Sequence, residues 1–151
     1  QNRFLLSSED GLHLFNTIDE SFTKLYDKKV YQLSLISNNQ LLVILSGKER
    51  MIRIKSVEHL LNHSESPFDS KIPETKNATL FTIEPVSLTL CVAIKNCLCI
   101  YKIYSRPQPY SYKHICDLHT TQIVTYLDIS ILEINNDKER ILWYGYSSTF
   151  M

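Results

Sequence analysis

The segment LLVILSGKERMIRIK constrains the fold of this chain most, because it joins two strand patterns through a glycine. Leu41–Leu45 is an uninterrupted apolar run, which is typical of a strand covered on both faces. Met51–Lys55 alternates, so that Ile52 and Ile54 point to one face of a strand and their polar neighbours point to the other. Gly47 can adopt the positive φ that tight hairpin turns often require. The segment therefore predicts a β-hairpin.

The tripeptide Ser46-Gly47-Lys48 also invites comparison with a phosphate-binding loop. Such a loop needs an earlier glycine, and a Ser or Thr directly after the lysine. Leu42 and Glu49 occupy these two positions. The sequence therefore argues against this type of nucleotide site and leaves a turn between two strands.

The same hairpin pattern recurs along the chain. We expect further turns at Asp10-Gly11, Lys95-Asn96 and Gly145-Tyr146, and all three glycines of the chain fall at the predicted turns. Successive turns are roughly 36, 49 and 50 residues apart, which is the repeat length of propeller blades with about four strands each. Alternating stretches at Val30–Ile36 and Thr125–Ile134 supply strands between the turns. The pattern predicts an all-β partial β-propeller of about three blades, with an ordinary barrel or sandwich as the alternative.

One short helix and one proline-containing loop interrupt the strand pattern. The helix is expected at Val57–Leu61, after the N-cap residue Ser56. The loop runs from Tyr104 to His114 and is either a stiffened connection or an exposed contact surface, since Tyr and Arg are favoured anchors of protein interfaces. The candidate interaction residues come from this loop and, secondarily, from the turn after Gly47: Arg106, Tyr110, Tyr112, Lys113, His114, Lys48 and Arg50.

Charge and hydropathy argue against two classes of partner. Sixteen Lys and Arg residues balance sixteen Asp and Glu residues, so the chain lacks the basic surplus with which proteins usually bind nucleic acid. No apolar run approaches the roughly 18 residues that a membrane-spanning helix needs. We therefore expect neither a nucleic-acid partner nor a transmembrane segment.

Four cysteines stand in apolar or strand-like settings without a CxxC pair: Cys91, Cys97, Cys99 and Cys116. Cys97 and Cys99 share a strand face and cannot easily bond to each other. Reduced structural thiols of an intracellular protein are the preferred interpretation, with a disulfide or a metal site as alternatives. His59 and His63 have the spacing of helical metal ligands but no evident third ligand. We therefore predict no metal and no other cofactor.

The sequence also indicates a segment without catalytic activity. It contains no arrangement of nucleophile, base and acid, and it lacks the HRD and DFG motifs of protein kinases. Isolated acids such as Asp69, Glu74 and Asp117 are interpreted as solvated loop or strand-face groups. No catalytic residue is predicted.

Three stretches resemble the citron-homology (CNH) domain family: KKVYQLSLISNNQLLVILSGKERMIRIKSVEHLL, DSKIPETKNATLF and LCVAIKNCLCIYKI. The N-terminal FLLSSEDGLHLF resembles the opening hairpin of that family. The VYQL and KIPETK phrases are most similar to the myotonic-dystrophy-kinase-related Ser/Thr kinases that bind Rho-family GTPases, followed by citron kinase. The family often has Gly-Cys after ETK, where this chain has Asn77-Ala78. Because Asn tolerates positive φ, we expect the backbone role of that glycine to survive.

The resemblance implies a fold and a role. It covers almost all 151 residues, and because the family's domain is nearly twice as long, residues 1–151 are expected to be the N-terminal part of a seven-bladed CNH propeller. It implies a non-catalytic regulatory module of a Ser/Thr kinase that contacts the rest of the propeller in the parent chain. The implied partners are Rho-family small GTPases or cytoskeletal and membrane-associated proteins, in the cytoplasm. A vesicle-tethering subunit or a Rho guanine-nucleotide exchange factor is the alternative parent.

Overall fold

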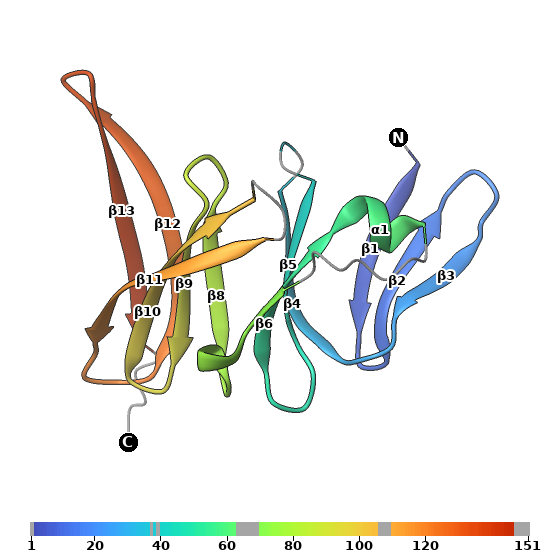
Figure 1. Cartoon of the computed structure of the whole chain (residues 1–151), viewed down its shortest axis with the longest axis horizontal. Coiled ribbons are helices and arrows are strands. Elements are labelled where there is room, and N and C mark those ends of the chain that lie inside the picture. The colour runs from blue at the N-terminus through green and yellow to red at the C-terminus, as the bar shows by residue number, and fades with distance from the viewer. Residues whose placement is uncertain (1, 37, 39, 63–69, 106–109, 147–151) are drawn as a thin grey trace. The chain divides into compact units, whose positions relative to one another are not determined.

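The computed structural model describes residues 2–36, 38, 40–62, 70–105 and 110–146. The chain forms two compact units, of which the first comprises residues 1–76 and 105–110 and the second comprises residues 77–104 and 111–151. Apart from two short helical segments, the described elements are antiparallel strands (Figure 1). The strands group into two sheets in each unit.

The first unit contains a three-stranded and a four-stranded sheet. The three-stranded sheet is built from β1 (Arg3–Ser8), β2 (Gly11–Asn16) and β3 (Phe22–Tyr26). The four-stranded sheet is built from β4 (Val30–Ile36), β5 (Leu41–Ser46), β6 (Met51–Ser56) and β7 (Ser70–Ile72). In both sheets the strands lie in chain order, so each strand pairs with its neighbour in sequence, as in a propeller blade.

The second unit contains a four-stranded sheet and a two-stranded hairpin. The sheet is built from β8 (Leu80–Glu84), β9 (Thr89–Ile94), β10 (Cys97–Tyr104) and β11 (Ser111–His119). The hairpin is built from β12 (Val124–Ile134) and β13 (Asp137–Tyr146). The sheet again follows chain order, so the blade-like pattern repeats in both units.

Three of the four predicted hairpin turns are confirmed, and one is wrong. The turns at Asp10-Gly11, Gly47-Lys48 and Lys95-Asn96 each separate two paired strands. Gly145 instead lies inside β13, opposite Tyr126. The turn between β12 and β13 falls at Asn135-Asn136, where both residues have positive φ. Because Asn tolerates this conformation, the turn needed no glycine, and the glycine pattern misplaced it.

The short helix is confirmed as α1 (Val57–Leu61), whose N-cap Ser56 accepts a hydrogen bond from the backbone amide of His59. His63 lies outside the described residues. A 3₁₀ turn, η2 (Pro73–Thr75), follows β7. Asn77 has a φ of 67°, so the expected left-handed backbone at the position of the family's glycine is confirmed.

The interpretation of residues 104–114 as one loop is partly wrong. Tyr104 ends β10, and residues from Ser111 onward belong to β11, which pairs with β10 along its length. The backbone groups of the residues from Ser111 onward are hydrogen-bonded within the sheet. The two prolines and the polar composition of the segment had indicated a loop instead. Residues 106–109, with the candidate Arg106, lie outside the described residues.

Each unit has its own apolar core. In the first unit, Leu12 from β2 packs with Val30, Leu42 and Ile44 from β4 and β5, and with Val57 from α1. In the second unit, the core joins the sheet to the hairpin through the buried residues Cys91, Ala93, Leu98 and Val124. The cores fix the strands, so that the loops at their ends carry the polar groups.

Candidate protein-interaction surface

The turn between β5 and β6 gathers basic side chains from two loops. Gly47 has a φ of 82° and Arg50 a φ of 49°, and the amide of Arg50 donates to the carbonyl of Gly47 at 3.2 Å. The amide of Gly47 donates to the carbonyl of Lys29 at 2.9 Å, which ties the segment before β4 to this turn. As a result Lys28 and Lys29, which are about 20 residues from Lys48 in the sequence, lie beside it.

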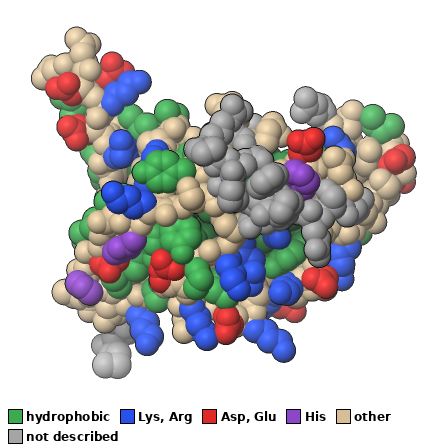
Figure 2. Space-filling model, viewed as in Figure 1, with side chains coloured by type: hydrophobic (Ala, Val, Ile, Leu, Met, Phe, Trp, Pro, Cys, Tyr) green, Lys and Arg blue, Asp and Glu red, His purple; other side chains and the backbone are tan. Residues whose placement is uncertain are grey.

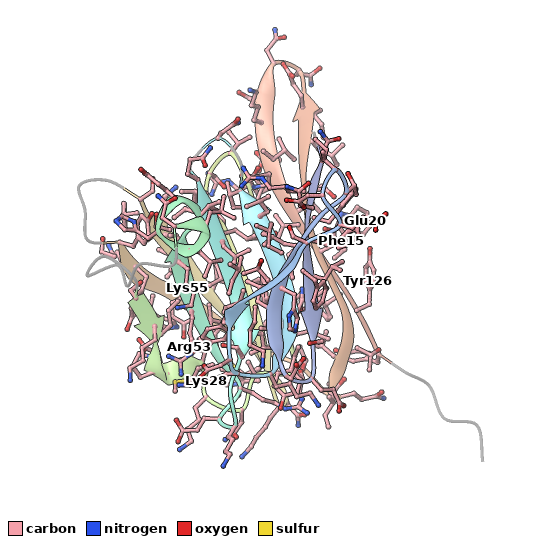
Figure 3. All side chains as sticks on the ribbon, turned by 90° about the vertical axis from the view of Figure 1, so that its right-hand side faces the viewer. Phe15, Glu20, Lys28, Arg53, Lys55 and Tyr126 are labelled. Atoms are coloured by element: carbon pink, nitrogen blue, oxygen red, sulfur yellow. The ribbon has the colours of Figure 1, made fainter. Side chains whose placement is uncertain are left out.

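These loops enclose a hollow of about 470 Å³ that we call the basic pocket. It is lined by Lys28, Lys29, Tyr31, Gly47, Lys48, Glu49 and Arg53. The Tyr31 ring supports two cations, because Lys29 Nζ lies 4.9 Å and the guanidinium carbon of Arg50 lies 4.2 Å from its centroid. Lys28 and Arg53 are labelled in Figure 3, and Figure 2 shows several Lys and Arg side chains grouped below the β4–β7 sheet.

The pocket carries more positive than negative charge. Its lining acid, Glu49, forms an ion pair with Lys76 at 2.8 Å, and this hydrogen bond and charge hold the pKa of Glu49 below its usual value. Among the described residues no carboxylate lies within ion-pair distance of Lys28 or Lys48. Exposed cations without nearby carboxylates create a positive potential, which attracts an acidic partner surface.

Arg53 extends this basic region. On the side away from the turn it lines a second, smaller hollow of about 230 Å³ with Lys55, Ser70 and Lys71. Its Nε is buried and has no hydrogen-bond partner among the described groups. A buried guanidinium N–H without an acceptor costs free energy, so an anionic group bound here would be stabilised.

A serine, an aspartate and a histidine meet at the β1–β2 turn, but their geometry is not that of a hydrolase. His13 Nε2 lies 3.1 Å from Ser8 Oγ and 3.0 Å from Asp10 Oδ1, so both groups contact the same ring nitrogen. A catalytic histidine uses one nitrogen for the nucleophile and the other for the acid. Here Nδ1 is buried and has no partner within the described part of the chain. The three side chains therefore form a hydrogen-bonded network that stabilises the β1–β2 turn at Gly11.

Comparison with known proteins identifies the family. A model of the CNH domain matches residues 1–151. The chain belongs to the CNH family. A solved structure described as the AfRom2 CNH domain superposes with a TM-score of 0.62 and 14% sequence identity, covering 83% of this chain and 42% of that chain. The likeness confirms the partial β-propeller predicted from the repeated hairpins.

The curated relatives are protein kinases. Human serine/threonine-protein kinase MRCK alpha is 33% identical over 107 residues, which cover 68% of this chain and 6% of the kinase. Human serine/threonine-protein kinase MRCK beta is 28% identical over 154 residues, which cover 99% of this chain and 8% of the kinase. The chain thus spans less than a tenth of the length of these relatives. It corresponds to a CNH domain, a non-catalytic part found in kinases.

The structure places the predicted interaction residues of this CNH domain in different environments. Lys48 lines the basic pocket and Arg50 stacks on Tyr31 at its edge, so these two are brought together. Tyr112 and His114 lie on one face of β11, with ring centroids 6.0 and 5.3 Å from that of Tyr101.

The remaining candidates are separated from these groups. Lys113 lies between Tyr112 and His114 on β11 and points to the opposite face, where it pairs in register with Lys102. Tyr110 is buried, with 6% of its surface exposed. A buried tyrosine offers little area to a partner, so Tyr110 is a weaker anchor than its residue type indicated.

His114 also holds an acid. Its Nε2 lies 2.7 Å from Asp117 Oδ1, and this hydrogen bond is the main cause of the lowered pKa of Asp117, to which Cys99 and His119 also contribute. Asp117 is exposed on a face of β11, as expected of a solvated strand-face acid, but it is not isolated, because it pairs with His114.

Sequence reasoning missed Lys28, Lys29, Tyr31 and Arg53 as parts of the basic pocket. The Lys28-Lys29 pair directly before a predicted strand was the available signal. Because β4 and β5 are antiparallel, the start of β4 meets the end of β5, and that pairing would have placed both lysines beside Lys48.

Among the described residues no helix is long and apolar enough to cross a membrane.

Proposed function

We propose that this CNH domain is a regulatory protein-interaction module of a Ser/Thr kinase, and that its basic pocket binds the acidic surface of a Rho-family small GTPase. The kinase context is supported by the curated relatives, which are serine/threonine-protein kinases. The GTPase part rests on the resemblance of the VYQL and KIPETK phrases and on the charge of the pocket. Cytoskeletal or membrane-associated proteins with acidic surfaces are the competing partners.

The basic pocket is the observation that carries the proposal. It combines a hollow of about 470 Å³, a tyrosine with two cations on its ring, and two lysines, Lys28 and Lys48, without a carboxylate at ion-pair distance among the described residues, while Lys29 pairs with Glu9 at 3.5 Å. Arg and Tyr are enriched at the energetic centres of protein interfaces, and an arginine can form two parallel bonds with a carboxylate. The pocket lies at loops beyond the strand ends, where a propeller is free to contact other proteins.

The test compares three double variants that change the net charge equally. Lys28→Glu with Lys48→Glu alters the basic pocket, and Arg106→Glu with Lys113→Glu alters the other predicted surface. Lys95→Glu with Lys138→Glu is the control, at exposed positions elsewhere. Binding of the complete domain to GTPases loaded with a GTP analogue or with GDP is measured by biolayer interferometry, together with a melting curve. Filamentous actin is tested in parallel by co-sedimentation.

We expect the pocket variant to weaken GTPase binding at least about tenfold, mainly because the two proteins associate more slowly. The difference from the unaltered domain should be smaller at high salt, because salt screens the charges. The control should bind as the unaltered domain does. Equal binding by all three folded variants would contradict the assignment of the pocket. Loss of GTPase binding only in the Arg106 and Lys113 variant would place the interface at that surface instead. Binding to actin without binding to any GTPase would contradict the proposed GTPase partner.

We further propose that the domain works in the cytoplasm. The four cysteines are free thiols, of which Cys91 is fully buried and has its pKa raised to about 12 by burial. Thiols persist in a reducing compartment. Fractionation of cells that produce the tagged full-length protein would check this, and recovery from the secreted fraction would contradict it.

A further inference from the structure

Strands β10 and β11 are neighbours in one sheet (Figure 1). Their register brings four potential metal ligands to one face of that sheet. In the antiparallel register Cys97 pairs with His119, and Cys99 pairs with Asp117. Because alternate residues of a strand share a face, all four side chains leave the sheet on the same side. We call these four residues the thiol cluster. The register shift between Ile100 and Tyr101 comes after these pairs and does not disturb them.

The ligand atoms of three of these residues, Cys97, Cys99 and Asp117, already lie within 4.8 Å of one another, whereas His119 is placed by the strand register alone. Cys97 Sγ and Cys99 Sγ lie 3.7 Å apart, and a carboxylate oxygen of Asp117 lies within 4.8 Å of both. Two thiolates bound to one tetrahedral zinc ion at about 2.3 Å lie about 3.8 Å from each other. The sulfur pair therefore needs no rearrangement, and the carboxylate needs only a small movement.

We propose that Cys97, Cys99 and Asp117 bind a zinc-like divalent metal ion, with His119 as the fourth ligand. Two thiolates favour zinc or another thiophilic ion over Mg²⁺ and Ca²⁺, which prefer oxygen ligands. Binding releases the two thiol protons to solvent, so that two sulfurs and one carboxylate face the ion as anions. Cys97 is partly exposed and the Asp117 side chain is 42% exposed, so the ion has a path from solvent.

A surrounding group already orients the carboxylate. His114 Nε2 lies 2.7 Å from Asp117 Oδ1, which leaves the other carboxylate oxygen for the ion. Metal-binding carboxylates are commonly held in this way by a neighbouring hydrogen-bond donor. His114 thereby becomes a positioning residue of the site.

Two simpler interpretations are distinguished from a metal site. A disulfide requires a sulfur–sulfur distance of about 2.05 Å, and both thiols are free. Hydrogen bonds hold the three groups together without an ion, between Cys97 and Cys99 at 3.7 Å and between Cys99 and Asp117. A bound cation would replace the thiol protons of these hydrogen bonds, so the metal titration separates the two states.

The experiment compares metal binding by the unaltered full-length protein and by its variants. Each protein is kept reduced and is first stripped of metal with a chelator. Zn²⁺ is titrated calorimetrically, and Co²⁺ serves as the spectroscopic probe of thiolate ligands. We expect Cys97→Ser with Cys99→Ser to lose one equivalent of bound metal. Cys116→Ser is the matched control, because Cys116 is the neighbour of Asp117 in β11 and points to the opposite face.

Two exposed substitutions keep the test decisive if the double serine variant fails to fold. Asp117→Asn should weaken Zn²⁺ binding at least about tenfold, and His114→Ala should weaken it about 10- to 100-fold. The unaltered protein should show a thiolate-to-cobalt charge-transfer band. Absence of that band, equal metal content in the unaltered and double serine proteins, or an equal loss in Cys116→Ser would each overturn the proposal.

Discussion

Strands β5 and β12 were both recognised from sequence, yet their environments differ completely. Every residue of β5 (Leu41–Ser46) is buried, whereas in β12 (Val124–Ile134) only Val124 is buried. β5 pairs with β4 on one side and β6 on the other, and its side chains fill both faces of its sheet. Within the described chain β12 pairs only with β13, and Leu127 and Ile129 pack on the core near its inner end.

The difference shows what supports each strand. Among the described residues, the β12–β13 hairpin leaves several large apolar side chains exposed, including Tyr126, Ile134 and Trp143. A two-stranded hairpin gains its stability from other elements packed on it, while a central strand is held by two neighbours. Substitutions in the packed sheets should therefore cost more than matched substitutions in the hairpin.

The largest effect is expected for Val43→Asp in β5. Val43 has no exposed surface, so the new carboxylate would lose its water without gaining a partner. We expect a loss of about 4 kcal/mol or more in the free energy of unfolding, measured by urea denaturation. The hairpin control is Ile131→Asp, at a position that is 39% exposed and pairs with Arg140. An equal loss at Ile131 would break the comparison.

The second effect concerns the glycines. Gly11 has a φ of 140°, and a Cβ added there would collide with the carbonyl oxygen of Tyr26. At Gly145 in β13 the nearest atom would be Tyr126 Cβ at 3.7 Å, an ordinary contact. We expect Gly11→Ala to cost about 2 to 3 kcal/mol of folding free energy and Gly145→Ala less than about 1 kcal/mol. Thermal melts of both variants measure this difference. A larger loss of stability in Gly145→Ala than in Gly11→Ala would contradict the prediction.

The third effect concerns two threonines. Buried Thr75 Oγ1 accepts from the amide of Ile52 at 2.9 Å and donates to the carbonyl of Ile72 at 2.6 Å. Thr75→Val leaves both backbone groups without that partner and should cost about 1 to 3 kcal/mol of folding free energy. Thr125→Val removes an exposed bond of 3.4 Å to the carbonyl of Gly145 and should cost about 0.5 kcal/mol at most. Urea denaturation of each variant should separate the two, and similar midpoints would count against the comparison.

The smallest effect is a dependence on pH at Glu84, the buried end of β8. Burial by itself would raise the pKa of Glu84, but hydrogen bonds from the Ser87 side chain and the amides of Val86 and Ser87 outweigh it and lower the pKa. With a folded pKa below the unfolded value of about 4.3, the stabilising contribution is complete above that pH and is lost as pH falls through the folded pKa.

Glu84→Gln should therefore lower the free energy of unfolding by about 1 kcal/mol at pH 7. Below about pH 5, the variant should lose less stability with falling pH than the unaltered chain does. Unfolding free energies measured from pH 7 to pH 3 check this. Glu139→Gln, at an exposed position of β13, should leave the profile unchanged. A profile that stays as steep in Glu84→Gln as in the unaltered chain would show that other groups cause the acid dependence.

Local patterns determined much of the fold. The alternating and apolar runs located β4, β5 and β12 to within a residue, and the N-cap Ser56 located α1. These signals depend only on neighbours two to four positions away, which the sequence displays directly. The turn at Asn135-Asn136 was missed because Gly145 was taken as the turn residue of this hairpin, although Asn can also supply positive φ.

Pairing between distant segments decided the sites. The sequence separates Lys28 from Lys48, and Cys99 from Asp117, by about twenty residues, and no local period links them. The register of β4 with β5 builds the basic pocket, and the register of β10 with β11 builds the thiol cluster. Because a shift of one residue would turn each side chain to the other face, these groups exist only once the sheets have formed.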